Sequence, residues 1–201
     1  AVQVYGGTFY QKVPPEYCAA GYEPKENADG TWGVVTETTY VAQIGDENKY
    51  TTLSEALTAV KDGETIKVLA PATVDMAETY EITGKAITLD LNGQTVTWNS
   101  SAKNMIEIGT DGGLTIQDAT DAGELHFVGT GTTSYGSGIN TLGNSSLSLT
   151  GGTVLYEHGE AGYGLNITGS STFTMTGGTV KIAGAVNYAV RLASTGQCQL
   201  N

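Results

Sequence analysis

The chain has 201 residues and a net charge of −12, with only 9 lysines and arginines. This charge disfavours DNA, RNA and anionic membranes as partners, because each of them binds through a cationic surface. Charged residues make up only 15% of the sequence, against roughly 25% in ordinary globular domains. Thr, Ser, Asn and Gly must therefore cover much of the surface, and no apolar run is as long as a membrane span requires.

Residues 1–40 have the pattern of a closing segment. The stretch AVQVYGGTF (1–9) alternates as strands do, and the proline pair 14–15 then ends the strand, because proline has no backbone N–H to donate. EYCAAGY suits one helical turn that ends at Gly21, and the Asp-Gly pair at 29–30 predicts a hairpin turn between YEPKEN and TWGVV. We interpret this region as a lid over the end of a stack of strands, whose open edges need covering.

The next segment has the pattern of a start cap. A small hairpin that turns at 46–48 comes first. Thr52 and Glu55 then have the spacing of a capping box, in which each side chain binds the backbone N–H of the other residue. The apolar residues of TLSEALTAV recur at helical spacing, so we expect an amphipathic helix near 52–61, laid across the first turn of a strand stack.

A repeated unit follows in the second half of the chain. SSLSLTGGTV (145–154) returns as STFTMTGGTV (171–180), a spacing of 26 residues (171 minus 145). Within each copy, apolar residues fall on every second position, which is the signature of a strand. A unit of this length cannot enclose a core alone, so it must stack on its neighbours as a solenoid. The alternative is an antiparallel β-sandwich with chance similarity, which needs no repeated phase.

Short strands separated by Gly, Asn, Ser and Thr are expected before the repeat as well. Their sequences are TIKVLA, TYEIT, AITLDLNG, QTVTW, MIEIG, GLTIQD and GELHFVG. Together with the repeat they predict about five to six turns. The opening stretch also matches the repeat in phase, with residues 2–9 in the places of residues 147–154, and CQLN (198–201) aligns with VQVY (2–5).

These residues resemble a known family. TLSEALTAVKDGETIKVLA, AITLDLNGQTVT and the recurring LTGGTV resemble right-handed parallel β-helix modules, pectate-lyase-like in fold, of large secreted or wall-anchored proteins from gut Gram-positive bacteria. GGTFYQKVPPEYCAAGYEPKENADGTWGVV resembles the closing segment of such modules. The resemblance implies an all-β, right-handed parallel β-helix with a capping helix and a lid hairpin. Residues 1–40 would close one module, and residues 41–201 would open the next, either at a junction or as one period of a head-to-tail array.

The outward positions of the expected strands offer little catalytic chemistry. A β-helix lyase or glycosidase would need paired carboxylates, or calcium-binding aspartates beside a base. Alternation predicts three outward columns: Glu107, Asn140, Asn166 and Arg191; Thr115, Ser148, Thr174 and Gln199; and Leu155 with Lys181. No column stacks two carboxylates, although Asp90 and Glu107 are candidate neighbours. We therefore expect no enzyme in this segment, with part of a polysaccharide lyase or glycoside hydrolase as the alternative.

Metal and cysteine chemistry is also weakly indicated. Four acidic residues are weak candidates for calcium ligands, namely Asp111, Asp118, Asp121 and Glu124. Their spacing matches no known calcium loop, and aspartates that form turns explain them equally well. The two cysteines, Cys18 and Cys198, lack zinc-type spacing and are interpreted as small buried residues; a bond between them would need the lid to fold over the final turn. No cofactor is expected.

Two loops are the candidate binding surface, because solenoids usually bind through loops. One is the long polar loop at 130–137, and the other is the glycine-rich segment 156–163. The candidate binding residues are Tyr135, Tyr156, Glu157, His158, Glu160, Tyr163 and Trp98. Burial is the alternative for two of them: Tyr156 has inward parity above Ile182, and Trp98 shares the parity of Val96. His126 is expected to face outward.

The expected function is that of a non-catalytic module in an extracellular protein, either secreted or anchored to a cell wall. Stacked turns would make it a stiff spacer, and its loops would offer an adhesin-like surface for a host glycan or host protein. Neighbouring modules of the same chain are the other expected partners. A module that binds one host protein, such as an immunoglobulin, is a further alternative.

Overall fold

The computed structural model describes residues 2–193 and 197–200, and the chain divides into two compact units, Ala1–Thr39 and Tyr40–Asn201. Unit 1 (Ala1–Thr39) contains an antiparallel sheet in the order β1-β3-β2. Its elements are β1 (Thr8–Phe9), the 3-10 helix η1 (Pro15–Tyr17), β2 (Tyr22–Glu26) and β3 (Trp32–Thr36). The predicted hairpin at 29–30 is confirmed, since Asp29 Oδ1 accepts hydrogen bonds from the backbone N–H and hydroxyl of Thr31.

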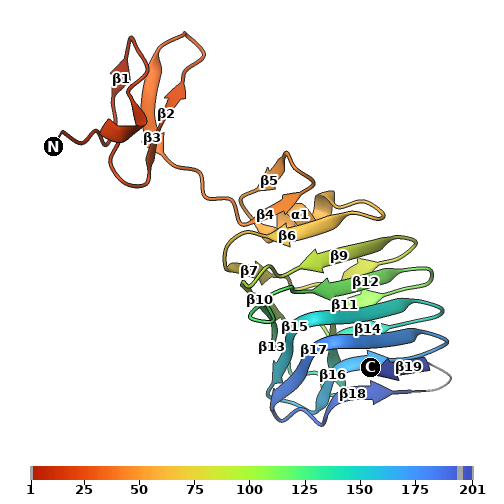
Figure 1. The fold of residues 1–201 in the computed structure, drawn as a ribbon. Helices are drawn as coiled ribbons and strands as arrows, with labels where there is room; N and C mark the ends of the chain where they lie inside the picture. Colours follow the sequence, from red (N-terminus) through yellow and green to blue (C-terminus); the bar gives the residue numbers. More distant parts are fainter. Residues whose placement is uncertain (1, 194–196, 201) are drawn as a thin grey trace. The chain divides into compact units, whose positions relative to one another are not determined.

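Unit 2 (Tyr40–Asn201) is a β-solenoid of about five turns, as the sequence predicts (Figure 1). One sheet has five strands: β8 (Tyr80–Ile82), β11 (Asn104–Ile108), β14 (Gly136–Thr141), β16 (Gly162–Ile167) and β18 (Tyr188–Leu192). The other sheet has eleven: β4 (Ala42–Ile44), β5 (Asn48–Tyr50), β6 (Thr65–Val68), β7 (Ala72–Asp75), β9 (Ala86–Asp90), β10 (Thr95–Ser100), β12 (Gly113–Gln117), β13 (Glu124–Gly129), β15 (Ser146–His158), β17 (Thr172–Gly184) and β19 (Gln197–Leu200). All seven short strands predicted before the repeat are present, and β7 is an additional one.

The repeated sequences form longer strands than expected. β15 and β17 each run for 13 residues and lie parallel to one another. The first half of β15 pairs with β12 and its second half with β13, so one strand bends across a corner and serves two faces of the solenoid. The bend lies at the glycine pairs of the repeat, where Gly152 and Gly178 have φ values of 79° and 78°. Residues with a Cβ rarely adopt this conformation, which explains the repeated Gly-Gly.

The start cap has the predicted form. The strands β4 and β5 make an antiparallel hairpin, and the helix α1 (Leu53–Ala59) follows. Both capping-box bonds are present, from the backbone N–H of Glu55 to Thr52 Oγ1 (3.2 Å) and from the backbone N–H of Thr52 to Glu55 Oε2 (3.1 Å). The helix buries its apolar face, including Leu53 and Leu57. In the described part of the chain, no helix has the length and apolarity needed to cross a membrane.

The core is a set of inward columns, in which each residue lies beside its counterpart in the next turn. One column carries Val74, Trp98, Phe127, Tyr156 and Ile182 in successive turns. The ring of Trp98 lies 6.0 Å from that of Phe127 and 5.9 Å from that of Tyr80, measured between centroids. Among the described side chains, the indole N–H of Trp98 is the buried polar group that lacks a hydrogen-bond partner. The tight packing around Trp98 therefore leaves its indole N–H without a hydrogen bond, which is unfavourable for a buried donor.

Candidate functional site

Three tyrosines form a row on the five-stranded sheet. Tyr163 lies in β16 and pairs with Tyr188 in β18, while Tyr135 immediately precedes β14. Ring centroids are 6.4 Å apart for Tyr135 and Tyr163, and 6.1 Å apart for Tyr163 and Tyr188. Tyr135 is 61% exposed and Tyr188 is 60% exposed. Exposed aromatic rings in neighbouring positions are uncommon on a surface unless a ligand or partner covers them.

The backbone at Tyr135 supports a functional role for this row. Its φ is 61°, in the left-handed region that bulky residues seldom adopt. The position is held by a hydrogen bond from its backbone N–H to the carbonyl oxygen of Ala161 in the next turn. Strain of this kind costs about 1–3 kcal/mol and clusters at functional sites. Here the strained backbone carries an exposed ring next to Tyr163.

A polar column runs beside the tyrosine row on the same sheet. It consists of residues in register on successive strands, namely Glu81, Glu107, Asn140, Asn166 and Arg191. Asn140 Nδ2 donates to Glu107 Oε2 (2.9 Å), Asn166 Nδ2 donates to Asn140 Oδ1 (2.8 Å), and Arg191 Nη1 donates to Asn166 Oδ1 (3.1 Å). The guanidinium of Arg191 also lies 4.8 Å from the centre of the Tyr163 ring. The column and the ring thus hold an exposed arginine in place, and among the described residues the column binds one of its five N–H donors.

This column corrects the expectation that no two outward carboxylates stack. Glu81 in β8 lies directly beside Glu107 in β11. The strand β8 has only three residues, and the sequence pattern does not reveal its register. The proposed neighbourhood of Asp90 and Glu107 is wrong, because Asp90 belongs to the other sheet, between Lys67 and Gln117. The carboxylate of Glu107 is occupied by amide N–H groups of Asn104 (3.1 Å) and Asn140 (2.9 Å).

The charge of this region differs from that of the whole chain. Residues 161–201 contain Lys181 and Arg191 and no aspartate or glutamate, although the chain carries a net charge of −12. Tyr163 and Tyr188 lie in this stretch, whereas Tyr135 lies outside it, in a loop that is bonded to Glu160. The two ends of the tyrosine row therefore differ in the charge of their surroundings.

The segment 156–163 is less exposed than the sequence suggests. Tyr156 is buried, as its inward parity predicts. His158, expected in an open loop, ends β15 and is only 5% exposed, because its ring stacks on Tyr156 at 5.9 Å and its Nδ1 accepts a hydrogen bond from the backbone N–H of Glu160. Both residues pack the interior side of this segment and are not available to an external ligand. Of the candidates here, Tyr163 joins the tyrosine row.

The acidic residues of that segment have partners on other turns. Glu157 Oε2 lies 3.0 Å from His126 Nε2, across the pairing of β13 with β15. Glu160 Oε2 accepts a hydrogen bond from the hydroxyl of Ser134 (3.2 Å), which ties the segment to the loop that carries Tyr135. His126 faces outward, as expected, but its pairing with Glu157 joins residues 31 positions apart and was not foreseen. Of these two contacts, the one between Ser134 and Glu160 lies next to the tyrosine row, whereas the one between His126 and Glu157 lies on the other sheet.

Trp98 does not contribute to a binding surface. Its side chain is 0% exposed, so stacking on a sugar, which requires an exposed ring, does not occur in this structure. This agrees with the alternative of internal packing. Trp32 lies half-buried in unit 1, where the ammonium group of Lys12 lies 5.2 Å above its ring.

The calcium candidates do not converge. Among the described residues, no three His, Cys, Asp or Glu side chains lie close enough to hold a metal ion. Asp111 accepts a hydrogen bond from Asn144 Nδ2 (2.7 Å), and Asp121 accepts one from the backbone N–H of Gly152 (3.0 Å). These two are turn residues with φ values of 56° and 54°. Glu124 begins β13, beside Thr153 of β15.

Asp118 stabilises a corner of the solenoid. It is 4% exposed and accepts hydrogen bonds from the backbone N–H groups of Gly93, Thr120 and Gly123. Burial alone raises the pKa of Asp118, but these hydrogen bonds favour the carboxylate more strongly, and the pKa lies below its ordinary value. The sequence pattern identified Asp118 as a turn residue but gave no sign of how many backbone donors it binds.

The structure describes the side chain of one of the two cysteines. Cys18 has a free thiol and follows η1, and a parallel bridge joins it to Val4. The side chain of Cys198 lies outside the part of the chain that the structure describes, so the proposed bond between the two stays a prediction.

Comparison with known proteins adds no relative. Neither the protein-family models, nor the curated proteins, nor the solved structures gave a match to this chain.

Proposed function

We propose that this chain is a non-catalytic module of an extracellular repeat protein, and that the tyrosine row (Tyr135, Tyr163 and Tyr188) with Arg191 binds a glycan. The proposed setting, a secreted or wall-anchored protein of a gut Gram-positive bacterium with pectate-lyase-like modules, rests on the sequence resemblance. The proposed binding activity rests on one observation: three tyrosine rings lie in a row on successive turns, the two outer rings are exposed, and the half-buried middle ring lies beside an arginine that is held in place.

The arrangement suits a sugar chain for chemical reasons. The C–H face of a pyranose packs on an aromatic ring, and its hydroxyls bind side-chain amides and guanidinium groups. Turns of the solenoid repeat at a strand spacing of about 4.8 Å, which is similar to the length of one pyranose unit. A linear glycan can therefore meet equivalent groups on successive turns. A protein interface would require a more continuous apolar centre than this row provides.

The solenoid itself serves as the support. Its parallel strands place Tyr163 and Tyr188 on regular elements, where side chains are held more rigidly than on loops, and Tyr135 lies in the turn directly before β14. In this proposal the same stack is also the stiff spacer that presents the row away from its point of attachment.

A glycan array followed by isothermal titration tests the proposal. Tyr188→Ala and Arg191→Ala should each weaken binding to the captured glycan at least about tenfold, which corresponds to about 1.4 kcal/mol. Tyr135→Asn should also lose affinity while keeping the fold, because asparagine tolerates the left-handed backbone. Tyr10→Ala, at a tyrosine that is 96% exposed in unit 1, is the matched control and should bind like the parent. Equal binding by all four variants would refute the assignment of the row.

A second function has one specific observation in its favour. The stacked pair Glu81 and Glu107 meets part of the requirement for glycoside hydrolysis, which needs two carboxylates across the scissile bond. Assays for released reducing ends or unsaturated products should be run on every glycan that the array captures. Activity that Glu81→Gln or Glu107→Gln abolishes would replace the non-catalytic proposal.

A further inference from the structure

A polar notch lies at a corner of unit 2, where the strands β7, β10 and β13 end. Its lining comes from three successive turns, namely residues 75–77, residues 99–101 and Thr130. The notch has a volume of about 550 Å³. Ligand sites typically measure roughly 300–1,000 Å³, so the notch is large enough to hold a small polar group such as a sugar residue.

Connections of unequal length create the notch. Residues 76–79 join β7 to β8, residues 101–103 join β10 to β11, and residues 130–135 join β13 to β14. The middle connection is the shortest, so it leaves a recess between its two longer neighbours. The longest connection packs closely on it, because a Cβ at Gly131 would lie only 2.7 Å from the carbonyl oxygen of Ser101.

The notch presents hydrogen-bonding groups in a fixed arrangement. Asp75 and Asn99 are partners in register on β7 and β10, and Asn99 Nδ2 donates to Asp75 Oδ1 (2.7 Å). This bond orients the amide, so that Asn99 Oδ1 and Asp75 Oδ2 are both available as acceptors. Within the described part of the chain, the hydroxyls of Ser101 and Thr130 have no hydrogen-bond partner. The notch can therefore both accept and donate hydrogen bonds, as the hydroxyls of a sugar require.

The charge of the notch limits which sugars it can hold. Among the described residues, its lining contains one carboxylate, that of Asp75, and no lysine or arginine. A uronic acid would place a second negative charge beside Asp75, which is unfavourable. A neutral hydroxyl instead donates a charge-assisted hydrogen bond to the carboxylate. The lining also includes Met76 and Ala77, which offer apolar surface to the C–H groups of a sugar ring.

The notch and the tyrosine row share one loop. The connection 130–135 starts at Thr130, on the notch, and ends at Tyr135, in the row. The hydroxyl of Ser134 donates to Glu160 Oε2 and so ties this loop to the next turn. The notch and the row together extend over about five turns of the solenoid. Four strand spacings of about 4.8 Å give about 19 Å, which suits about five sugar units, one per turn.

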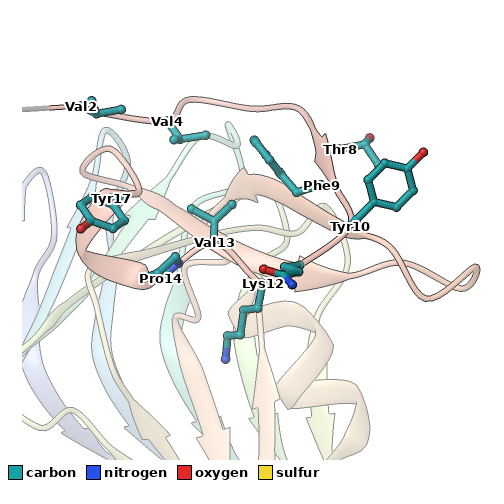
Figure 2. Close-up of a pocket in the computed structure, with 10 residues that line it drawn as sticks. Val2, Val4, Thr8, Phe9, Tyr10, Lys12, Val13, Pro14 and Tyr17 are labelled. Carbon is teal, nitrogen blue, oxygen red and sulfur yellow. The ribbon is translucent and has the colours of Figure 1, made fainter.

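A second hollow does not offer the same chemistry. It lies in unit 1 and has a volume of about 840 Å³, and Figure 2 shows Val4, Phe9 and Val13 around it. Its lining is mainly aliphatic and aromatic. Because the hydroxyls of a sugar need polar partners, the notch is the better candidate for a sugar site.

We propose that the notch is a further subsite of the glycan site, where Asp75 and Asn99 bind the hydroxyls of a neutral sugar residue. This inference rests on the proposed function, because the tyrosine row holds the rest of the same glycan. The glycan then lies along the axis of the solenoid in one direction. Its sugar in the notch must be neutral, whereas a sugar near Arg191 can carry a carboxylate.

Isothermal titration with oligosaccharides of defined length tests the subsite. The probes are neutral gluco-, manno- and galacto-oligosaccharides of two to six units, together with the corresponding oligouronates. In the neutral series that binds, affinity should rise up to about five units and then level off, because five turns are then covered. The oligouronate of five units should bind more weakly than its neutral counterpart, because it places a carboxylate beside Asp75.

The main variant is Asp75→Asn, which keeps an acceptor for Asn99 and removes the charge. It should weaken binding of the neutral five-unit probe about fivefold to tenfold and reduce the preference for neutral over charged probes. Binding of the three-unit probe, which the row alone can hold, should not change. Asp75 is exposed, so the fold should survive, which circular dichroism checks. Asp46→Asn, at an exposed residue of the start cap, is the matched control and should bind like the parent.

Tyr188→Ala separates this proposal from the proposed function. If Tyr188→Ala weakens binding of probes of every length and Asp75→Asn weakens none, the row stands and the notch proposal is wrong. If only Asp75→Asn weakens binding, the notch is not a subsite of the row, and the proposal is also wrong. A parent that binds none of the neutral probes overturns the notch proposal, and the glycan array then decides the fate of the row separately.

Discussion

The middle turns and the last described turn of the solenoid have the same sequence pattern and different environments. Along one inward column, Val74, Trp98 and Phe127 are 0% exposed and Tyr156 is 1% exposed, but Ile182, the next member, is 37% exposed. Alternation along a strand fixes which way a side chain points. Whether that side chain is buried depends on the neighbouring turn, which the strand itself does not encode. A side chain that points inward in a solenoid is therefore buried only where a neighbouring turn covers it.

The strongest test of this difference uses one substitution at two places. Ile167→Ala, in a middle turn, should destabilise the protein by about 3–4 kcal/mol, because it leaves a cavity among packed side chains. Ile182→Ala, in the last turn, should cost less than about 1 kcal/mol, because the site is already partly hydrated. Urea unfolding of both variants and the parent measures the gap. Equal costs would mean that the last turn is covered in solution.

Removing the carboxylate at a corner of a middle turn should have the next largest effect. Asp118→Ala leaves backbone donors unpaired at a buried corner and should cost about 3 kcal/mol. The matched control is Thr176→Ala, at an exposed residue beside the glycine corner of β17, which should change stability by less than about 0.5 kcal/mol. Thermal or urea unfolding at neutral pH compares the two.

The same carboxylate predicts a pH dependence. Because the folded-state pKa of Asp118 is lowered, its contribution is complete above the unfolded-state pKa of about 3.9 and is lost as the pH falls through the folded-state value. The stability of the parent and of Asp118→Ala should therefore converge below about pH 4. Parallel curves down to the lowest accessible pH would contradict the assignment of the lowered pKa to this corner.

The buried column should also respond to alkaline conditions. Burial raises the pKa of Tyr156, and likewise that of Tyr80, to about 12. A raised folded-state pKa means that the stabilisation is present below the unfolded-state value of about 10 and is lost as the pH rises towards 12, by about 2 kcal/mol per tyrosine. Tyr156→Phe should remove about half of this loss and leave the half that belongs to Tyr80. A variant that follows the parent throughout would show that the column admits water.

The smallest effect is expected at the unpaired indole. Trp98→Phe loses buried apolar area but also removes an N–H that has no partner in the described structure. The lost apolar burial lowers stability, whereas removal of the unpaired N–H raises it, so the free energy of unfolding should change by less than about 1 kcal/mol. Trp98→Ala, which only creates a cavity, should cost about 3–5 kcal/mol and serves as the comparison. A large loss in the phenylalanine variant would mean that the N–H is bound by water.

Much of the fold follows from local sequence. The capping box at Thr52 and Glu55, the hairpin at 29–30 and the alternation in the repeat each depend on residues a few positions apart, and each is confirmed. The register between turns is harder, because connecting loops differ in length. The stacking of Glu81 on Glu107 and the contact between His126 and Glu157 depend on that register, and both were missed.

The candidate site also divides into residues that local sequence identifies and residues that only the register between turns identifies. Tyr135 and Tyr163 were identified because they lie in polar, glycine-rich loops. Tyr188 was not identified, since only its alignment with Tyr163 in the next turn brings it to the same surface. The burial of His158 was also missed, because its ring fits against Gly129 of the preceding turn, where the absence of a side chain leaves room for it. Contacts between turns determine which loop residues reach the surface.

The bent strands of the repeat have a mechanical consequence. β15 and β17 each continue through a corner, so two faces of the solenoid share one hydrogen-bonded ribbon in the last turns. Earlier turns divide the same path into separate strands, such as β12 and β13. A pulling force or a local opening that detaches one half of β17 therefore strains the other half. In an earlier turn, the strand on one face can detach while the strand on the other face stays paired. We expect amide hydrogens on the two faces to exchange together in the repeat and independently before it.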